Sequence, residues 1–248
     1  MATDQSIRDP GPRTPDSGPI ARDPGPRTPD PGRLRYDAVL YDHDGTLVNS
    51  LPVVVAATNA VLVRHGFPAE PPQVVIDAMV YATTPRMGFH ARGSDPSLHP
   101  QLAEEFYAEA RRLGPLHATA YNGVADLLTT LAARGMRQGI ISNNQGEVVR
   151  IITRHLGLAQ HLAFAWGEDD VTAPKPAPDG IRQAAKKLGV PLDRILFVGD
   201  SENDSEAAQA AGVACVGVTW GIHSRAKLAT LGFDHLIDHP RQLLALLA

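Results

Sequence analysis

The chain has 248 residues, of which 43% are hydrophobic, and a formal net charge of −4 at pH 7. This length suffices for one sizeable core, or for a core domain with a smaller insertion. The mild acidity provides no basic surface for nucleic acid and no polybasic segment for a membrane, so neither is expected as a partner. No apolar stretch approaches the roughly 18 residues of a transmembrane helix, and the N-terminus lacks the apolar segment of a secretory signal. The single cysteine, Cys215, cannot form an intrachain disulfide, which fits a reducing, cytoplasmic location.

The N-terminal segment, residues 1–34, differs in composition from the rest of the chain. The stretch "RDPGPRTPD" occurs at Arg8–Asp16 and again at Arg22–Asp30. The segment is rich in Pro, Gly, Asp and Arg and has almost no large apolar side chains. It therefore cannot bury enough surface to offset the entropy cost of ordering. We predict that residues 1–34 are a disordered tail.

Beyond the tail, short apolar runs alternate with helical patterns. The apolar runs predict strands at residues 36–42, 137–143, 161–167, 195–200 and 214–219. The helical patterns predict helices at residues 50–67, 123–136, 147–158, 178–190, 205–213 and 240–247. Strands that alternate with helices are typical of a parallel sheet covered on both faces. The predicted fold class is therefore α/β, with a Rossmann-like, doubly wound parallel sheet.

Three of the predicted strands end in polar residues. The runs "VLYD", "GIISN" and "LFVGD" bring Asp42, Ser142 and Asp200 to strand ends. In an open parallel sheet, ligands bind beyond the carboxyl ends of the strands. If these three strands are neighbours, the three side chains should converge on one crevice.

A second aspartate, Asp44, follows Asp42 after one residue in "YDHDGTL". Residues two apart in an extended segment face the same way, so both carboxylates are expected in the crevice and His43 is expected to face away. Carboxylates this close repel one another unless one is protonated or a cation binds. Oxygen ligands on a tight loop suit Mg²⁺. Lys175 in "APKPAP", stiffened by the flanking prolines, supplies a second cation.

Hydroxyl donors complete this set of groups. Thr46 and Ser142 lie beside the carboxylates in sequence or at the expected strand ends. Carboxylates, a metal ion, a lysine and hydroxyl donors together are typical of a site that binds and transfers a phosphoryl group.

Other interpretations exist for the individual motifs. "DHDG" alone can be a tight turn, because Asp-Gly is common in turns. It can also begin a calcium loop, but an EF-hand loop needs further oxygen ligands where this chain has Leu47 and Val48. A metal site of a nucleotide-sugar transferase is disfavoured because no donor-binding motif is present.

In this order, "DHDGTL", "ISNN", the lysine of "PKPAP" and "GDSEND" resemble the four motifs of the haloacid dehalogenase superfamily. The two aspartates of the first motif resemble its phosphatase branch. The C-terminal "VGVTWGIHSRAKLATLGFDHLID" is similar to the same region of phosphoglycolate phosphatases. The resemblance implies a core domain formed by residues 35–50 and 119–248, with a small helical cap domain at residues 51–118.

The resemblance also implies roles. Asp42 is implied as the nucleophile, and Asp44 as the general acid and then the general base, for which a raised pKa is expected. Lys175 is implied to offset the negative charge of the nucleophile and the phosphate. The Thr46 hydroxyl is expected to position Asp44. The implied magnesium ligands and supporting residues are Asp42, Asp44, Asp200 and Asp204. The implied phosphate and substrate contacts are Thr46, Ser142 and Asn143.

The cap is expected to select the substrate, with Arg86 as its candidate for a carboxylate or a second phosphate. His43, Asn49 and Asn144 depart from the residues usual in the family, and Asn49 and Asn144 are expected to affect the choice of substrate rather than the chemistry. The predicted function is a Mg²⁺-dependent phosphatase on a small phosphorylated metabolite, with 2-phosphoglycolate as the first candidate. A sugar-phosphate or nucleotide phosphatase, or a phosphomutase, is the alternative with the same site. A regulatory or binding protein on this fold is the alternative without catalysis.

Overall fold

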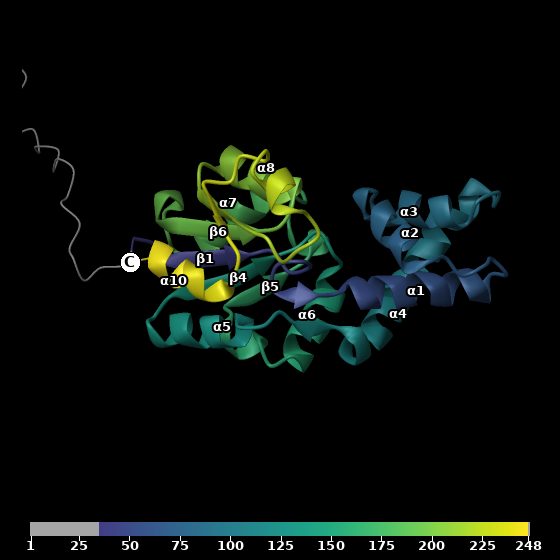
Figure 1. Cartoon of the computed structure of the whole chain (residues 1–248), viewed down its shortest axis with the longest axis horizontal. Helices are drawn as coiled ribbons and strands as arrows, with labels where there is room; N and C mark the ends of the chain where they lie inside the picture. The colour runs from purple at the N-terminus through teal and green to yellow at the C-terminus, as the bar shows by residue number, and fades with distance from the viewer. Residues whose placement is uncertain (1–34, 248) are drawn as a thin grey trace, which may run out of the picture. The chain divides into compact units, whose positions relative to one another are not determined.

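In the computed structural model of the protein, six of the strands form one sheet, and helices alternate with them along the chain (Figure 1). Its strand order is β5-β4-β1-β6-β7-β8, and every neighbouring pair is parallel. The strands are β1 (Ala38–Tyr41), β4 (Arg137–Ile141), β5 (Phe164–Trp166), β6 (Ile195–Gly199), β7 (Ala214–Val218) and β8 (His235–Ile237). The structure describes residues 35–247, so the predicted disordered tail lies outside the described residues.

Strand β1 lies inside the sheet, and its four side chains are fully buried. Successive side chains of a strand point to opposite faces of a sheet. Val39 and Tyr41 accordingly belong to the apolar core on one face, whereas Ala38 and Leu40 belong to the core on the other. Burial on both faces explains why this run is apolar without alternation.

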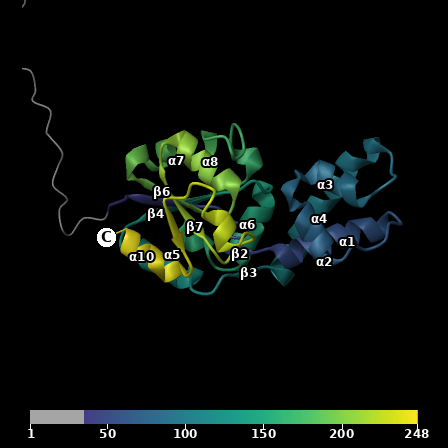
Figure 2. The same ribbon diagram turned by 45° about the horizontal axis from the view of Figure 1, so that its top comes forward.

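Helices cover both faces of the sheet (Figures 1 and 2). One face carries α7 (Asp179–Leu188) and α8 (Glu202–Ala211), and the other carries α5 (Val124–Ala133), α6 (Gly146–His155) and α10 (Leu243–Leu246). This doubly wound arrangement confirms the predicted fold class.

Four helices lie between β2 (Val48–Asn49) and β3 (Thr119–Ala120), two short strands that pair antiparallel. We call residues 51–117 the helical insertion. Its helices are α1 (Leu51–Arg64), α2 (Pro72–Asp77), α3 (Thr83–His90) and α4 (His99–His117). Helix α4 packs against α1 and α3 and also against α6. The division of the chain into a core domain and a cap domain stays a prediction.

Several short elements complete the described chain. Helix α9 spans Arg225–Leu228, and the 3₁₀ helices are Ala78–Val80, Pro96–Leu98, Ala159–His161, Glu168–Asp170, Leu192–Arg194 and Pro240–Gln242. The sequence analysis did not predict β2, β3 or β8, and the two residues of β2 and of β3 are too few to show a periodic pattern. Within residues 35–247, no helix is both long enough and apolar enough to span a membrane.

Candidate active site

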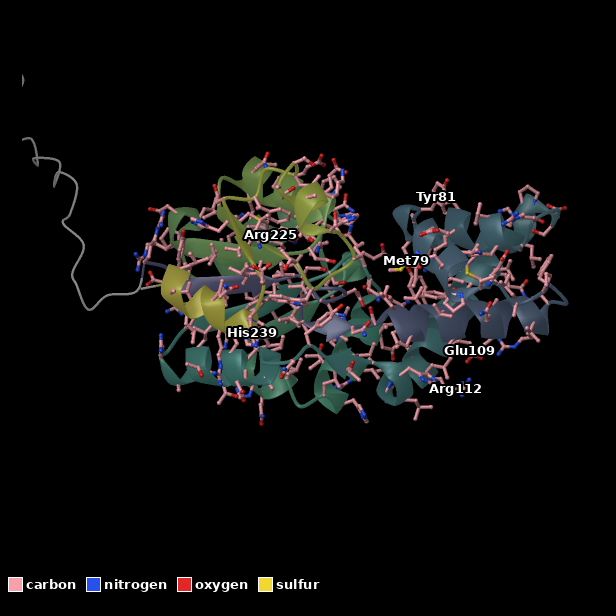
Figure 3. All side chains as sticks on the ribbon, in the orientation of Figure 1. Met79, Tyr81, Glu109, Arg112, Arg225 and His239 are labelled. Carbon is pink, nitrogen blue, oxygen red and sulfur yellow. The ribbon has the colours of Figure 1, made fainter. Side chains whose placement is uncertain are left out.

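The ends of β4, β1 and β6 lie side by side, as the sequence predicted, because these strands are neighbours in the sheet. Asp42, Ser142 and Asp200 follow these strands and line one cavity of about 430 Å³. Asp44 and Lys175 line the same cavity. The helical insertion forms its opposite wall, with Met79, which Figure 3 shows on the side of the insertion next to the sheet, among the lining residues.

A buried lysine joins two of the carboxylates. The Lys175 ammonium donates to Asp42 Oδ1 and to Asp204 Oδ1, both at 2.6 Å. Burial raises the pKa of Asp42 to about 7; the Lys175 charge opposes this shift, and Asp204 and Asp44 add to it. Burial, with the charges of Asp42 and Asp204, also raises the pKa of Asp200. The site therefore has more negative charge than one lysine can compensate.

A divalent cation fits this cluster. Oxygens of Asp42, Asp200 and Asp204 lie within 4.8 Å of one another. Both Asp204 oxygens are already occupied, one by Lys175 and the other by the Asp200 and Ser201 backbone N–H groups and the Ser201 hydroxyl. Asp42 contacts Lys175 through Oδ1, and each Asp200 oxygen has one contact, the Thr46 hydroxyl at 3.4 Å from Oδ1 and the Ile222 N–H at 3.0 Å from Oδ2. These two carboxylates are less fully bonded than Asp204 and are the better candidates to hold an ion, while Asp204 holds the lysine and the Asp200 loop in place.

The surroundings of Asp44 differ from the expectation. Asn144 Nδ2 donates to its Oδ2 at 3.1 Å, and the Ser142 hydroxyl lies 3.4 Å from the same oxygen. Burial alone raises the pKa of Asp44, but the charge and contact of His43 and hydrogen bonds from Ser50 and Asn144 outweigh it. The pKa of Asp44 is therefore lowered, and the expectation of a raised pKa is wrong.

His43 does not face away from the aspartates. Its ring is fully buried, and Nδ1 lies 3.2 Å from Asp44 Oδ1. The prediction failed because β1 ends at Tyr41, and alternation applies only within a strand. After Tyr41 the chain turns, with the N–H groups of Leu47 and Val48 donating to the His43 carbonyl.

Two predicted phosphate contacts have other partners in the structure. The Asn143 side chain donates to the Lys175 carbonyl at 2.6 Å and accepts from the Lys175 N–H at 2.9 Å, so it fixes the lysine loop. The Thr46 hydroxyl lies 3.4 Å from Asp200 Oδ1 rather than positioning Asp44, and Thr46 is buried. Asn143 lines the cavity and its amide has a second N–H group, so the phosphate contacts of Asn143 and Thr46 stay predictions.

Gly45 permits the close approach of the two acidic loops. Its φ is +83°, and a Cβ atom there would lie 2.2 Å from Asp200 Oδ2. The left-handed φ and the lack of space both require glycine. The Asp-Gly pair therefore serves the site and not a surface turn.

Arg86 lies on α3 in the helical insertion and lines the cavity, as the sequence analysis anticipated. Its guanidinium stacks over the Phe106 ring, with 4.7 Å between Cζ and the ring centroid. Sequence patterns did not indicate Phe106 or Tyr81 as cavity residues, because each looks like an ordinary apolar position of a helix or loop.

A link between the insertion and the sheet was also missed. Tyr107 on α4 donates to Glu168 at 3.0 Å and shares a hydrogen bond with the Thr83 hydroxyl at 2.9 Å. Glu168 follows β5, so this link joins elements that are distant in sequence. No local sequence motif indicates this contact.

Comparisons with known proteins agree with this geometry. Residues 39–218 match the family of haloacid dehalogenase-like hydrolases. The N-acetylmuramic acid 6-phosphate phosphatase of Pseudomonas aeruginosa is 32% identical, with 87% of this chain and 96% of that protein covered. The phosphoglycolate phosphatase of Yersinia pseudotuberculosis is also 32% identical, over 83% of this chain and 90% of the relative.

A solved structure supports the same assignment. A haloacid dehalogenase-like hydrolase from Bacteroides fragilis superposes with a TM-score of 0.75 and 26% identity, covering 84% of this chain and 99% of that one. The matched span contains the aspartate pair, the lysine loop and the Asp200 loop. The chain therefore belongs to the haloacid dehalogenase-like hydrolase family and is a phosphoric monoester hydrolase of its phosphatase branch.

Proposed function

We propose that the protein is a Mg²⁺-dependent phosphatase that acts on a small phosphorylated metabolite through an aspartyl-phosphate on Asp42. The observation that supports this most strongly is the buried Lys175–Asp42 pair at 2.6 Å, with Asp44 beside it in the same cavity. A buried, oriented carboxylate at a cavity wall is suited to attack phosphorus.

In the first step, Asp42 attacks phosphorus and the bond between phosphorus and the alcohol oxygen breaks. Asp44 gives its proton to the departing oxygen. Since the pKa of Asp44 is lowered in the free site, the proton has to arrive on substrate binding, when the negative phosphate beside Asp44 raises its pKa. In the second step, Asp44 takes a proton from the water that attacks phosphorus, and Asp42 is released.

Asp42 and Asp200 are the residues that would hold Mg²⁺, with Asp204 supporting them through Lys175 and the Asp200 loop. When bound, the ion supplies positive charge that favours both the ionised nucleophile and the phosphoryl oxygens. The Ser142 hydroxyl, Asn143 and Lys175 line the cavity on the sheet side and are our candidates to contact the phosphoryl group. We keep the cytoplasmic location as a prediction.

Two substrates are candidates. 2-Phosphoglycolate is the first, and it is the substrate in the name of a relative that this chain resembles along most of its length. N-acetylmuramic acid 6-phosphate is the second, because a cavity of about 430 Å³ with Met79, Tyr81 and Phe106 in its wall has room for a sugar. A phosphomutase would have to pass the phosphoryl group to a second hydroxyl instead of water.

A panel of phosphate esters tests the proposal. Initial rates would be measured for 2-phosphoglycolate, sugar phosphates and nucleotides, with Mg²⁺ and with EDTA. We expect turnover only with the metal, and loss of turnover in a folded Asp42→Asn variant. Absence of hydrolysis across the panel in the presence of Mg²⁺ would contradict the proposal, and transfer to a sugar with little free phosphate would favour the mutase.

A further inference from the structure

Arg86 is a buried cation at the active-site cavity that forms no ion pair within the described part of the chain, although the charge of Asp44 acts on it from a distance. It is 7% exposed, and no acidic side chain within residues 35–247 forms an ion pair with it. Its Nε is buried without a hydrogen-bond partner. A buried guanidinium that has no ion-pair partner and leaves its Nε–H unsatisfied is costly, so its presence in a cavity indicates a ligand that completes it.

The Phe106 ring fixes the guanidinium in place. The ring lies beneath Arg86, with 4.7 Å from Cζ to its centroid. Stacking on an aromatic face leaves the edge of the planar guanidinium free to donate in the cavity. That edge offers parallel N–H groups, which match the two oxygens of one carboxylate.

Arg86 is on a different wall of the cavity from the groups proposed to hold the phosphoryl group, although the charge of Asp44 reaches it. Those groups follow the carboxyl ends of the strands, whereas Arg86 is on α3 in the helical insertion. A phosphoryl group in line with Asp42 directs the alcohol part of the ester towards the insertion. Arg86 is thus placed to contact the leaving alcohol and not the transferred group.

The charge of the cavity selects among anions. Asp42, Asp44, Asp200 and Glu168 all line it, against two cations, Lys175 and Arg86. A second phosphate would add up to two negative charges beside these carboxylates. A carboxylate adds one, which a single guanidinium can compensate.

We propose that Arg86 binds a carboxylate on the alcohol part of the substrate, so that the enzyme prefers phosphate monoesters of hydroxy acids. This inference rests on the proposed phosphatase function. The Arg86 side chain determines the substrate class, and Phe106 is the residue that positions Arg86.

Matched pairs of esters test the inference. 2-Phosphoglycolate has a carboxylate where ethyl phosphate has a methyl group, and N-acetylmuramic acid 6-phosphate has a lactyl ether with its carboxylate where N-acetylglucosamine 6-phosphate has a hydroxyl group. For the pair with the higher wild-type turnover, we expect Arg86→Gln to lower the ratio of kcat/KM, acid over neutral ester, by about 10- to 100-fold, the range of a lost charged hydrogen bond. Arg92→Gln, at an exposed arginine of the same segment, is the control and should leave the ratio unchanged.

Each result has one interpretation. An equal fall for both esters in a folded Arg86→Gln variant would show that Arg86 holds the transferred phosphoryl group and would overturn the inference, as would no change. A selective fall for glucose 1,6-bisphosphate relative to glucose 6-phosphate would point to a second phosphate and overturn it too. If Arg86→Gln does not fold, Arg86→Lys, which lacks the planar fork, should show a smaller fall of the same ratio. Wild-type inactivity on all esters would contradict the proposed function itself.

Discussion

Replacing Lys175 with methionine tests how the carboxylate cluster is held together. Lys175 contacts Asp42 and Asp204 at 2.6 Å each, and its side chain is 4% exposed. At an effective dielectric constant near 20, each pair of charges at this distance attracts by roughly 6 kcal/mol before desolvation is subtracted. Removing one partner of a buried pair leaves uncompensated charge, so we expect Lys175→Met to lower the free energy of unfolding by about 3–5 kcal/mol.

The same substitution should affect catalysis. The Lys175 charge opposes the rise in the Asp42 pKa, which is already about 7, so its removal raises that pKa further and leaves the nucleophile protonated at neutral pH. We expect kcat to fall by at least about 100-fold. Urea unfolding in EDTA and in Mg²⁺, together with initial rates, gives both quantities. Mg²⁺ should restore part of the stability, because a cation returns to the cluster.

Lys186→Met is the matched control, because Lys186 is an exposed lysine on α7. It should change neither the stability nor the rate appreciably. If Lys175→Met unfolded at the same urea concentration as this control and kept its turnover, the role assigned to the lysine would be refuted.

Three further predictions concern separate parts of the molecule. Glu109 on α4, labelled in Figure 3, accepts from Arg64 and Arg112, and these contacts lower its pKa. A carboxylate whose pKa is lowered by folding stabilises the folded state above its unfolded pKa of about 4.3, and this stabilisation is lost as the pH falls through the folded value. We therefore expect Glu109→Gln to lower the free energy of unfolding by about 0.5–1 kcal/mol at pH 7 and to leave it unchanged at strongly acidic pH. Equal cost at both pH values, measured by urea unfolding, would contradict this. Gly45→Ala should abolish turnover and weaken Mg²⁺ binding, measured by calorimetry, because its Cβ would lie 2.2 Å from Asp200 Oδ2; wild-type affinity would argue against the steric reason. Mg²⁺ should raise the Tm of the wild type but not of Asp200→Asn, and an equal rise in both would exclude Asp200 as a ligand.

The arrangement of the strands could be predicted because each relevant run is apolar and ends in a polar residue. Burial of β1 on both faces produces the unbroken run "AVLY", and β6, "ILFVG", has the same character, whereas β4, "RQGII", is apolar only towards its end. Their parallel pairing then fixes where Asp42, Ser142 and Asp200 meet. This part of the site depends on local sequence and on a general property of parallel sheets.

Other features depend on contacts that no local pattern encodes. The alternation argument places His43 away from Asp44 only if the strand continues, and the chain turns after Tyr41 instead. The lowered pKa of Asp44 results from side chains on three segments, including Asn144 on the loop after β4. The Asn143 side-chain amide hydrogen-bonds to the backbone of Lys175, and the residues next to Asn143 in sequence do not indicate this contact.

The cavity wall provided by the insertion was the least predictable part. Arg86 was identified as a candidate from its polarity alone. The Phe106 ring beneath it comes from a different helix, and the Tyr107–Glu168 link connects α4 to the 3₁₀ helix after β5. Such contacts follow from tertiary packing and not from periodicity.

Trapping the phosphorylated residue tests the central claim most directly. The enzyme would be mixed with Mg²⁺ and its best ester, quenched during turnover, and reduced with borohydride, which converts an aspartyl-phosphate to homoserine. Peptide mass spectrometry then locates the change. We predict homoserine at position 42 and unchanged Asp44, with no conversion in the absence of substrate. Conversion at another residue, or none during rapid turnover, would contradict Asp42 as the nucleophile.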